Sequence, residues 1–376
     1  MSRRGFLAGA AATGLSAATL SPTPAAAATS DAEAAELTRT AQRHRTRLAL
    51  LGTVGGPTWY GDHSDHGICS ALLVGDQAYL VDFGSGAYRQ LRHAGVAPGQ
   101  ERALFITHLH SDHVIDLASL LMYDPGARHK AASTLHIVGP GRRGPLPPLP
   151  PGLPEPPLEN PDNPGAGTAD MVNSLFAAHA ADLNVRIRSE GGADVRRHIR
   201  AHDIALPPGH DADPNKTTAP DMDPFVVWED ENVRVSATLV PHGLVFPNLA
   251  YRIDTEDGSV AFSGDTAVSE NLIRLARGVD ILVHEVIDME WIREVVGPQP
   301  WNPSQQALYD HIVGGHTQIQ EVGPVAERAG AKTLVLSHLV PGGLPNSHWQ
   351  EAAKGFSGRT IVGRDMTQIG VGRRSA

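Results

Sequence analysis

Thr107-His108-Leu109-His110-Ser111-Asp112-His113 is the stretch that decides the fold of this chain. It follows Ala103-Leu104-Phe105-Ile106, a short apolar run that predicts a buried strand. Alternate residues of an extended chain point the same way, so His108 and His110 can bind one cation together. Asp112 and His113 are adjacent and point apart from each other, and we infer that they serve a second cation beside the first.

The donor atoms of this stretch indicate which metals it suits. Imidazole nitrogen and carboxylate oxygen are ligands for zinc, and also for manganese or iron. A polar surface loop that happens to be rich in histidine is the alternative interpretation. Four ligand side chains within the six residues 108–113, directly after a strand, favour the metal site.

The pattern His-x-His-x-Asp-His after a strand resembles the signature of the metallo-β-lactamase fold hydrolases. The resemblance implies an α/β fold, namely a four-layer αββα sandwich. In this chain the sandwich would carry a proline-rich insert at about residues 139–230.

Composition limits the alternatives. The 376 residues are 41% hydrophobic and 19% charged, which is ample for a large core. The net charge of −10 predicts no general nucleic-acid-binding surface. Beyond the N-terminus, no apolar run approaches the roughly 20 residues of a membrane span. The single cysteine, Cys69, excludes an internal disulfide framework, and its apolar neighbours predict a buried thiol.

The N-terminus has the features of a targeting segment. Ser2-Arg3-Arg4-Gly5-Phe6-Leu7 precedes a small, weakly apolar stretch and an alanine-rich run, as in a signal peptide over residues 1–28. The arginine pair resembles a twin-arginine signal, which implies bacterial export of an already folded protein to the periplasm or the medium. An amphipathic helix is the alternative. Residues 29–45 are predicted as a polar leader or a short helix, and residues 46–376 as a single domain.

Three other segments have open interpretations. Residues 139–164 hold 11 of the 29 prolines and predict a stiff, extended arm. The loop 61–66, with His63 and His66, is interpreted as lining the substrate mouth, with a second metal site or a solvated loop as alternatives. Residues 114–123 predict a helix with Ile115 among its apolar positions. Five arginines contact an anionic substrate or, more commonly for such a pattern, lie on a solvated surface; they are Arg186, Arg188, Arg196, Arg197 and Arg200.

Several predicted strands end in a potential metal ligand or acid. The strand before Asp82 offers a carboxylate that could accept the second ring proton of a ligating histidine. Strand-tip ligands on one rim are how a two-sheet scaffold builds a rigid metal site. The predicted set places His108, His110 and His242 on one metal and Asp112, His113 and His338 on the other, with Asp265 bridging them. This set leaves coordination positions open for water, as a catalytic site requires.

Further motifs narrow the resemblance to the tRNase Z-like branch, which includes zinc phosphodiesterases and arylsulfatases. The motifs are Leu51–Gly56, Ile106–His113, Ser263–Thr266, His284-Glu285, His316-Thr317 and Leu336–His338. The resemblance implies that His316 lies over the metal pair and assists the leaving group or clamps the anion, and that Glu285 orients His316. A helix-start histidine is the alternative for His316.

The departures from that branch also matter. In processing tRNase Z the RNA-gripping arm lies between the residues matched here by His242 and Asp265, which a single short hairpin separates in this chain. The absence of Cys at position 265 argues against the common β-lactamases. His110, where diiron oxygen reductases carry Glu, argues against that branch.

We therefore expect an exported dinuclear zinc hydrolase with two Zn²⁺, or Mn²⁺ or Fe²⁺ in their place, and a metal-bridged hydroxide. Asp112 would orient the nucleophile and His316 would give a proton or hydrogen bond to the departing oxygen. The expected substrate is a small phosphodiester or an aryl phosphate or sulfate ester. The alternatives are a lactone or thioester hydrolase, a secreted nuclease with tRNA 3′-endonuclease-like activity, and a non-catalytic zinc-binding envelope protein. The sequence leaves a homodimer open.

Overall fold

A computed structural model describes residues 30–58, 60–61, 65–189, 191–192 and 194–372 of the chain. The predicted signal peptide over residues 1–28 and His63 lie outside the described residues. Of the two alternatives for residues 29–45, the structure has the short helix, α1 (Asp31–Ala41). The Ser30 hydroxyl oxygen caps it by accepting the Glu33 N–H at 3.2 Å.

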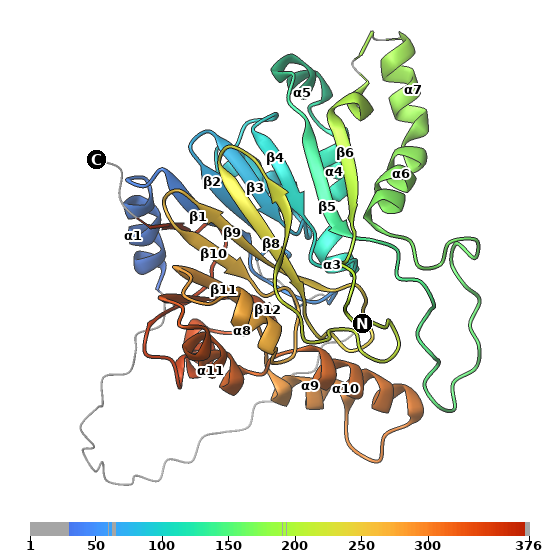
Figure 1. Cartoon of the computed structure of the whole chain (residues 1–376), viewed down its shortest axis with the longest axis vertical. Helices are drawn as coiled ribbons and strands as arrows, with labels where there is room; N and C mark the ends of the chain where they lie inside the picture. Colours follow the sequence, from blue (N-terminus) through green and yellow to red (C-terminus); the bar gives the residue numbers. More distant parts are fainter. Residues whose placement is uncertain (1–29, 59, 62–64, 190, 193, 373–376) are drawn as a thin grey trace, which may run out of the picture.

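The strands of the described part of the chain form two seven-stranded sheets, drawn mainly in blue to green and in yellow to red in Figure 1. The first sheet has the order β14 (Gln368–Gly370), β1 (Thr46–Gly52), β2 (Cys69–Val74), β3 (Gln77–Val81), β4 (Glu101–Phe105), β5 (Leu135–Pro140), β6 (Ile199–Ile204). The second has the order β13 (Arg359–Val362), β12 (Thr333–Val340), β11 (Ile281–Ile287), β10 (Ser259–Phe262), β9 (Leu249–Thr255), β8 (Val233–Leu239), β7 (Phe225–Glu229).

The period of two along each strand separates the apolar core into layers. Leu48 and Leu50 of β1 belong to the core between the sheets, whereas Ala49 and Leu51 belong to the core under the helices of the first sheet. Ala261 of β10 likewise faces the helices of the second sheet. Each fully buried leucine contributes about 1.5–3 kcal/mol of transfer free energy. Both faces of both sheets are therefore apolar, which stabilises the predicted four-layer sandwich.

Helices cover the outer face of each sheet. The first sheet carries α2 (Ala87–His93), α4 (Leu117–Met122), α6 (Thr168–Ala178) and α7 (Ala180–Ser189), and the second carries α8 (Glu270–Leu275) and α11 (Ile319–Ala329). The remaining helical elements are α3 (Ser111–Val114), α5 (Pro125–Ala131), η1 (Val195–His198), α9 (Met289–Val296), α10 (Pro303–Gly315), α12 (Asn346–Trp349) and η2 (Gln350–Ala353). Helices α9 and α10 lie together at one end of the sandwich (Figure 1). None of the described helices has both the length and the apolar character of a membrane-spanning helix.

The single helix predicted over residues 114–123 is wrong, because the structure divides it into α3 and α4. The Asp116 carboxylate lies at the break, where it accepts the Tyr88 N–H at 2.8 Å and the Ser119 hydroxyl at 2.6 Å. The break turns Ile115 away from the core, and its side chain is 61% exposed. The apolar position predicted there is therefore a surface position.

Two predicted segments shape the surroundings of the ligand-bearing strand ends. Only β9 and β10, paired antiparallel, separate His242 from Asp265, as the sequence indicated. The proline-rich stretch 141–167 contains neither helix nor strand and extends from the body of the molecule (Figure 1). The Arg143 guanidinium fixes its base by donating to the Asn215 side chain and to the Leu244 carbonyl, at 2.9 and 3.0 Å. The insert is thus tied to the loop that follows His242.

Candidate metal centre

The candidate ligands leave strand ends of both sheets and meet at one rim. The backbone N–H of Thr107 donates to the Asp82 carboxylate at 2.8 Å, which fixes the chain as it leaves β4. His110 has extended backbone and precedes the first turn of α3, so Asp112 and His113 lie on that turn. His242, Asp265 and His338 come from β8, β10 and β12 of the other sheet.

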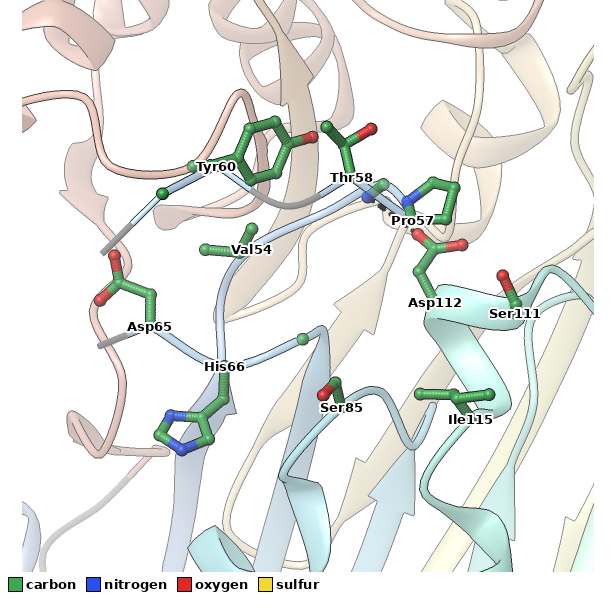
Figure 2. A pocket seen from close by; sticks show the side chains of 14 residues that line it. Val54, Pro57, Thr58, Tyr60, Asp65, His66, Ser85, Ser111, Asp112 and Ile115 are labelled. Carbon is green, nitrogen blue, oxygen red and sulfur yellow. Dashed lines mark hydrogen bonds between the residues drawn. The ribbon is translucent and has the colours of Figure 1, made fainter. Parts of the chain in front are cut away.

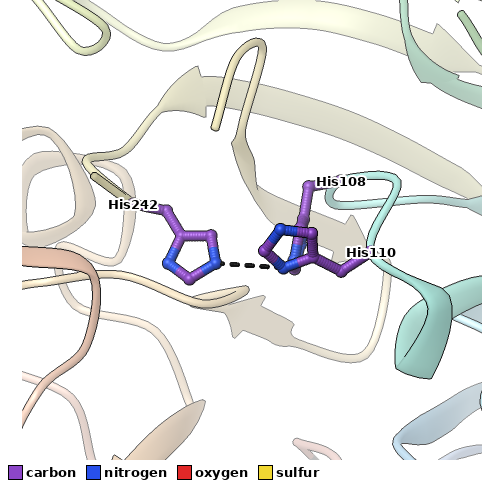
Figure 3. Close-up of side chains that lie close together, drawn as sticks. All are labelled: His108, His110 and His242. Atoms are coloured by element: carbon purple, nitrogen blue, oxygen red, sulfur yellow. Dashed lines mark hydrogen bonds between the residues drawn. The ribbon is translucent and has the colours of Figure 1, made fainter. Parts of the chain in front are cut away.

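His108, His110 and His242 form the first cluster (Figure 3). One ligand atom from each lies within 4.8 Å of the others. His242 Nε2 is 3.3 Å from His110 Nδ1. His242 Nδ1–H donates to the Gly315 carbonyl at 2.8 Å, which assigns the lone pair to the Nε2 that faces the cluster. The three residues predicted for one metal are therefore brought together.

The second cluster consists of Asp112, His113, Asp265 and His338. One ligand atom from each lies within 4.8 Å of the others. His113 Nε2 and His338 Nε2 lie 3.2 Å apart. Asp265 Oδ1 lies 3.4 Å from His113 Nε2 and 3.2 Å from His338 Nε2. Its other oxygen, Oδ2, lies 3.9 Å from the Nε2 atoms of both His108 and His242. Asp265 therefore presents one oxygen to each cluster, the arrangement expected of a bridging carboxylate.

The residues present fit a pair of divalent cations. His108 Nε2 and Asp265 Oδ1 are buried and have no hydrogen-bond partner in the described part of the chain, and such atoms are costly unless something binds them. Burial lowers the pKa of His108 and His242 well below the usual value, which favours the neutral imidazole that ligates metals. Burial opposes ionisation of Asp265, but His338 and His113 hold the pKa of this carboxyl well below its usual range.

Two glycines let backbone approach the histidine rings. A Cβ atom on Gly55 would collide with the ring of His338. A Cβ atom on Gly315 would lie 2.7 Å from His242 Nδ1. His338 itself has φ of 49°, a conformation that is uncommon for a residue with a side chain and recurs at functional sites.

Asp82 holds one of the rings from behind. His113 Nδ1–H donates to Asp82 Oδ2 at 2.8 Å. His113 is therefore the ligating histidine whose second ring proton Asp82 was predicted to accept. The Thr107 hydroxyl also donates to Asp82 and lies 3.1 Å from His108 Nδ1. Asp82 thereby orients His113 directly and His108 through Thr107, as carboxylates behind metal-binding histidines do.

We predict that Asp82→Asn lowers metal affinity about 10- to 100-fold, because the amide cannot accept from His113 as a carboxylate does. Asn is a matched replacement, since Asp82 has φ of 56° and Asn tolerates that conformation as well as Asp. Competition with a chelator, followed by metal analysis, measures the affinity. Unchanged affinity in the folded variant would contradict the orienting role.

Glu285, which is buried, and His316, which is partly buried, form a pair beside the clusters. His316 Nδ1–H donates to the Glu285 carboxylate, 3.0 Å from Oε2, and the Thr266 N–H donates to Oε1 at 2.6 Å. Burial lowers the pKa of His316, but Glu285 outweighs it and raises the pKa to about 9. A ligand atom of His316 lies within 4.8 Å of those of His242 and Asp265. His316 is therefore held with one ring nitrogen toward the first cluster.

The sequence interpretation missed His311 of α10. Its ring centroid lies 5.3 Å from that of His242 and 6.0 Å from that of His110. Burial lowers the pKa of His311 to about 4. The only signal in the sequence is its position five residues before His316, and α10 was not predicted.

The remaining histidine and arginine candidates lie elsewhere. The His66 backbone N–H and ring Nδ1 both bond to Asp365 Oδ2, at 2.7 and 2.8 Å, and His66 joins no potential metal-ligand group among the described residues. The five arginines lie on α7, η1 and β6. Arg186 and Arg196 pair with Asp182 and Asp194 on exposed surface, which agrees with the solvated interpretation.

Comparison with protein families gives two matches, which overlap at residues 174–181. A model described as the metallo-beta-lactamase superfamily matches residues 64–181, and a model described as the beta-lactamase superfamily domain matches residues 174–339. Together the two matches span the metal motif, the hairpin and His338.

Curated relatives and solved structures agree with these matches. Ribonuclease Z of Mycobacterium bovis (strain BCG / Pasteur 1173P2) is 29% identical over 328 residues, which are 86% of this chain and 98% of the relative. Ribonuclease Z of Mycobacterium tuberculosis (strain ATCC 25618 / H37Rv) is 28% identical over 86% of this chain and 97% of the relative. Human tRNase Z, short form, has a TM-score of 0.54 at 17% identity, over 86% and 99% of the two chains. The metallo-beta-lactamase fold protein YhfI of Bacillus subtilis has a TM-score of 0.52 at 18% identity, over 86% of this chain and 98% of that protein. At these identities the two structures show the shared fold.

Proposed function

The chain belongs to the metallo-β-lactamase superfamily and is a hydrolase of that superfamily with Ribonuclease Z homologues, and from this premise we propose that it is a dinuclear metal-dependent phosphodiesterase for small esters. The observation that carries the proposal is the position of Asp265, with one oxygen toward His113 and His338 and the other toward His108 and His242. That position supports two adjacent cations rather than one.

The donor set supports zinc as the native metal. Five histidine nitrogens and two carboxylates suit Zn²⁺, while Mn²⁺ and Fe²⁺ remain compatible with the same ligands. His108, His110 and His242 would hold one cation, Asp112, His113 and His338 the other, and Asp265 both. Cations bound there supply Lewis acidity and a strong nucleophile from water at neutral pH.

The side chains of the chain supply orientation and proton transfer. Asp112 Oδ2 accepts the Gly56 N–H at 2.9 Å, and a carboxylate held in this way can accept a hydrogen bond from the attacking water. His316, fixed through Nδ1 by Glu285, can give a proton from its other nitrogen to the departing oxygen. His311 beside the first cluster can donate a hydrogen bond to an anionic oxygen of the substrate.

RNA is the second candidate substrate, because the curated relatives named above are Ribonuclease Z enzymes over 86% of this chain. Two observations favour the small ester. Between His242 and Asp265 there is only the β9–β10 hairpin. The net charge of −10 also opposes a polyanion, whose binding depends on neutralising phosphates with Lys and Arg.

The test is metal analysis of the purified protein together with a substrate panel. The panel contains bis(4-nitrophenyl) phosphate, 4-nitrophenyl sulfate, a lactone, a thioester and a precursor tRNA. We expect two metal ions per chain and metal-dependent turnover of the phosphate diester, lost in His110→Ala. Zinc-loaded protein that turns over neither the phosphate nor the sulfate ester would overturn the proposal, and cleavage of the tRNA alone would establish the second candidate.

We also propose that the protein is exported, on the basis of Arg3 and Arg4 before Gly5-Phe6-Leu7. We predict that the double variant Arg3→Lys and Arg4→Lys accumulates inside a bacterial host, whereas the unaltered chain reaches the periplasm or the medium. Cell fractionation with immunodetection measures the distribution. The matched control is Arg39→Lys and Arg43→Lys, and equal distribution of all three proteins would refute the signal.

A further inference from the structure

A pocket of about 410 Å³ opens beside the second cluster (Figure 2). It shares Asp112 with that cluster, since the Asp112 carboxylate both lines the pocket and lies 3.3 Å from His338 Nε2. Pockets of 300–1,000 Å³ are typical of small-ligand sites. This one lies directly against the proposed reaction centre.

Two connections hold the pocket walls in place. The Tyr60 hydroxyl donates to the Gly55 carbonyl at 2.9 Å, and the Tyr60 ring packs edge-on against Trp291 with centroids 5.6 Å apart. On the other side, Asp365 accepts from the backbone N–H and the ring of His66. Tyr60 is thus attached to α9, and His66 is attached to the loop before β14. These contacts hold two of the described lining residues in place without a ligand.

The lining of the pocket combines apolar side chains with a larger number of polar ones, His66 among them. Val54, Pro57, Tyr60 and Ile115 provide the apolar surface. Thr58, Ser85 and Ser111 provide hydroxyls, and Asp65 and Asp112 provide carboxylates. No Lys or Arg is among the described residues that line it.

This lining selects against a chain of phosphates. A polyanion here would find no lysine or arginine among the described lining residues to neutralise its charge. An uncharged ring would instead pack against the Tyr60 ring and the aliphatic side chains, with the hydroxyls available for a ring substituent.

We propose that this pocket is the subsite for an uncharged aryl group of the substrate ester. The inference rests on the proposed function and refines it, because it names the organic part of the ester that the reaction centre acts on. The pocket would hold a single aromatic ring next to the phosphorus.

Ile115→Lys tests the subsite, since the side chain at position 115 is 61% exposed and tolerates a polar replacement without loss of the fold. We expect KM for bis(4-nitrophenyl) phosphate to rise about tenfold, because one ring loses part of its apolar contact, with kcat within about twofold of the unaltered protein. KM for a diester whose ring carries a carboxylate should fall. The matched control is Val185→Lys on α7, where the side chain is 55% exposed.

A second measurement separates this inference from the proposed activity. Saturation-transfer NMR with 4-nitrobenzyl alcohol, an uncharged aryl probe, reports binding to the pocket whether or not any ester is hydrolysed. Binding that is lost in Ile115→Lys and kept in Val185→Lys supports the subsite, even if no diester is turned over, in which case only the phosphodiesterase proposal fails. Equal binding of this uncharged probe in all three proteins, or an equal KM in all three for diesters that are turned over, overturns the subsite.

Discussion

Asp265→Ala is expected to lower kcat/KM of the metal-dependent reaction at least about a thousandfold, since loss of the cation pair removes several kcal/mol of transition-state stabilisation. The residue is buried, and its two oxygens lie within 3.9 Å of nitrogen atoms from both clusters. Without it, His108, His113, His242 and His338 would face two cations with no shared anion between them. We therefore expect metal analysis to find fewer than two ions per chain.

The controls separate charge from folding. Asp221→Ala removes a carboxylate that is 83% exposed and pairs with Arg274 on the surface, so it should change neither metal content nor rate. Asp265→Asn retains the shape of the side chain but not its charge. Its loss of metal should be nearly as large as that of the alanine variant. A fully loaded, fully active Asp265→Ala protein would remove the basis for the dinuclear proposal.

The second large effect is expected for His316→Ala, whose kcat should fall about a hundred- to a thousandfold, as losing a general acid does. The loss should depend on the leaving group. 4-Nitrophenol departs without a proton, so its diester should be the least affected. A diester of unsubstituted phenol needs the proton and should be the most affected. Rate measurements over a series of substituted phenyl esters give this dependence.

His316 also has a ligand atom near His242 and Asp265, so metal content must be measured alongside the rate. Unchanged metal content with a leaving-group-dependent loss supports the proton donor. Loss of a metal ion, with equal rate reductions for all leaving groups, would make His316 a ligand instead. Glu285→Gln should show the same leaving-group dependence in weaker form, because it leaves His316 in place but removes the carboxylate that raises its pKa.

Six of the seven candidate ligands were predictable because they follow a strand. His338 was predicted in the same way, but its strand, β12, continues past it to Val340. Strand ends of a sandwich share a rim, so short apolar runs before His242, Asp265 and His338 were enough to bring these residues together in the prediction. Asp82 was predictable for the same reason, although its partner His113 was not. Asp82 makes this contact from a left-handed backbone conformation, which has no signature in the sequence.

His311 and the exposure of Ile115 were beyond sequence reasoning for a different reason. His311 is close to the first cluster because α10 packs on α9 at one end of the sandwich, and its helix has no marked apolar stripe to predict that contact. Ile115 continues an apolar helical pattern, but hydrogen bonds to Asp116 break the helix and turn it outward. Long-range packing in the first case and a local polar contact in the second outweigh periodicity.

The two sheets contribute to the metal centre almost equally. His108 to His113 follow a strand of one sheet, while His242 and Asp265 follow strands of the other and His338 lies within its strand β12. Cations bound at this rim would cross-link the two halves of the sandwich. At a free metal concentration a thousandfold above Kd, they would add about 4 kcal/mol to the free energy of unfolding. Depleting the metal should therefore weaken the packing between the two sheets before either sheet unfolds. The cations that the reaction requires would therefore also link the two sheets.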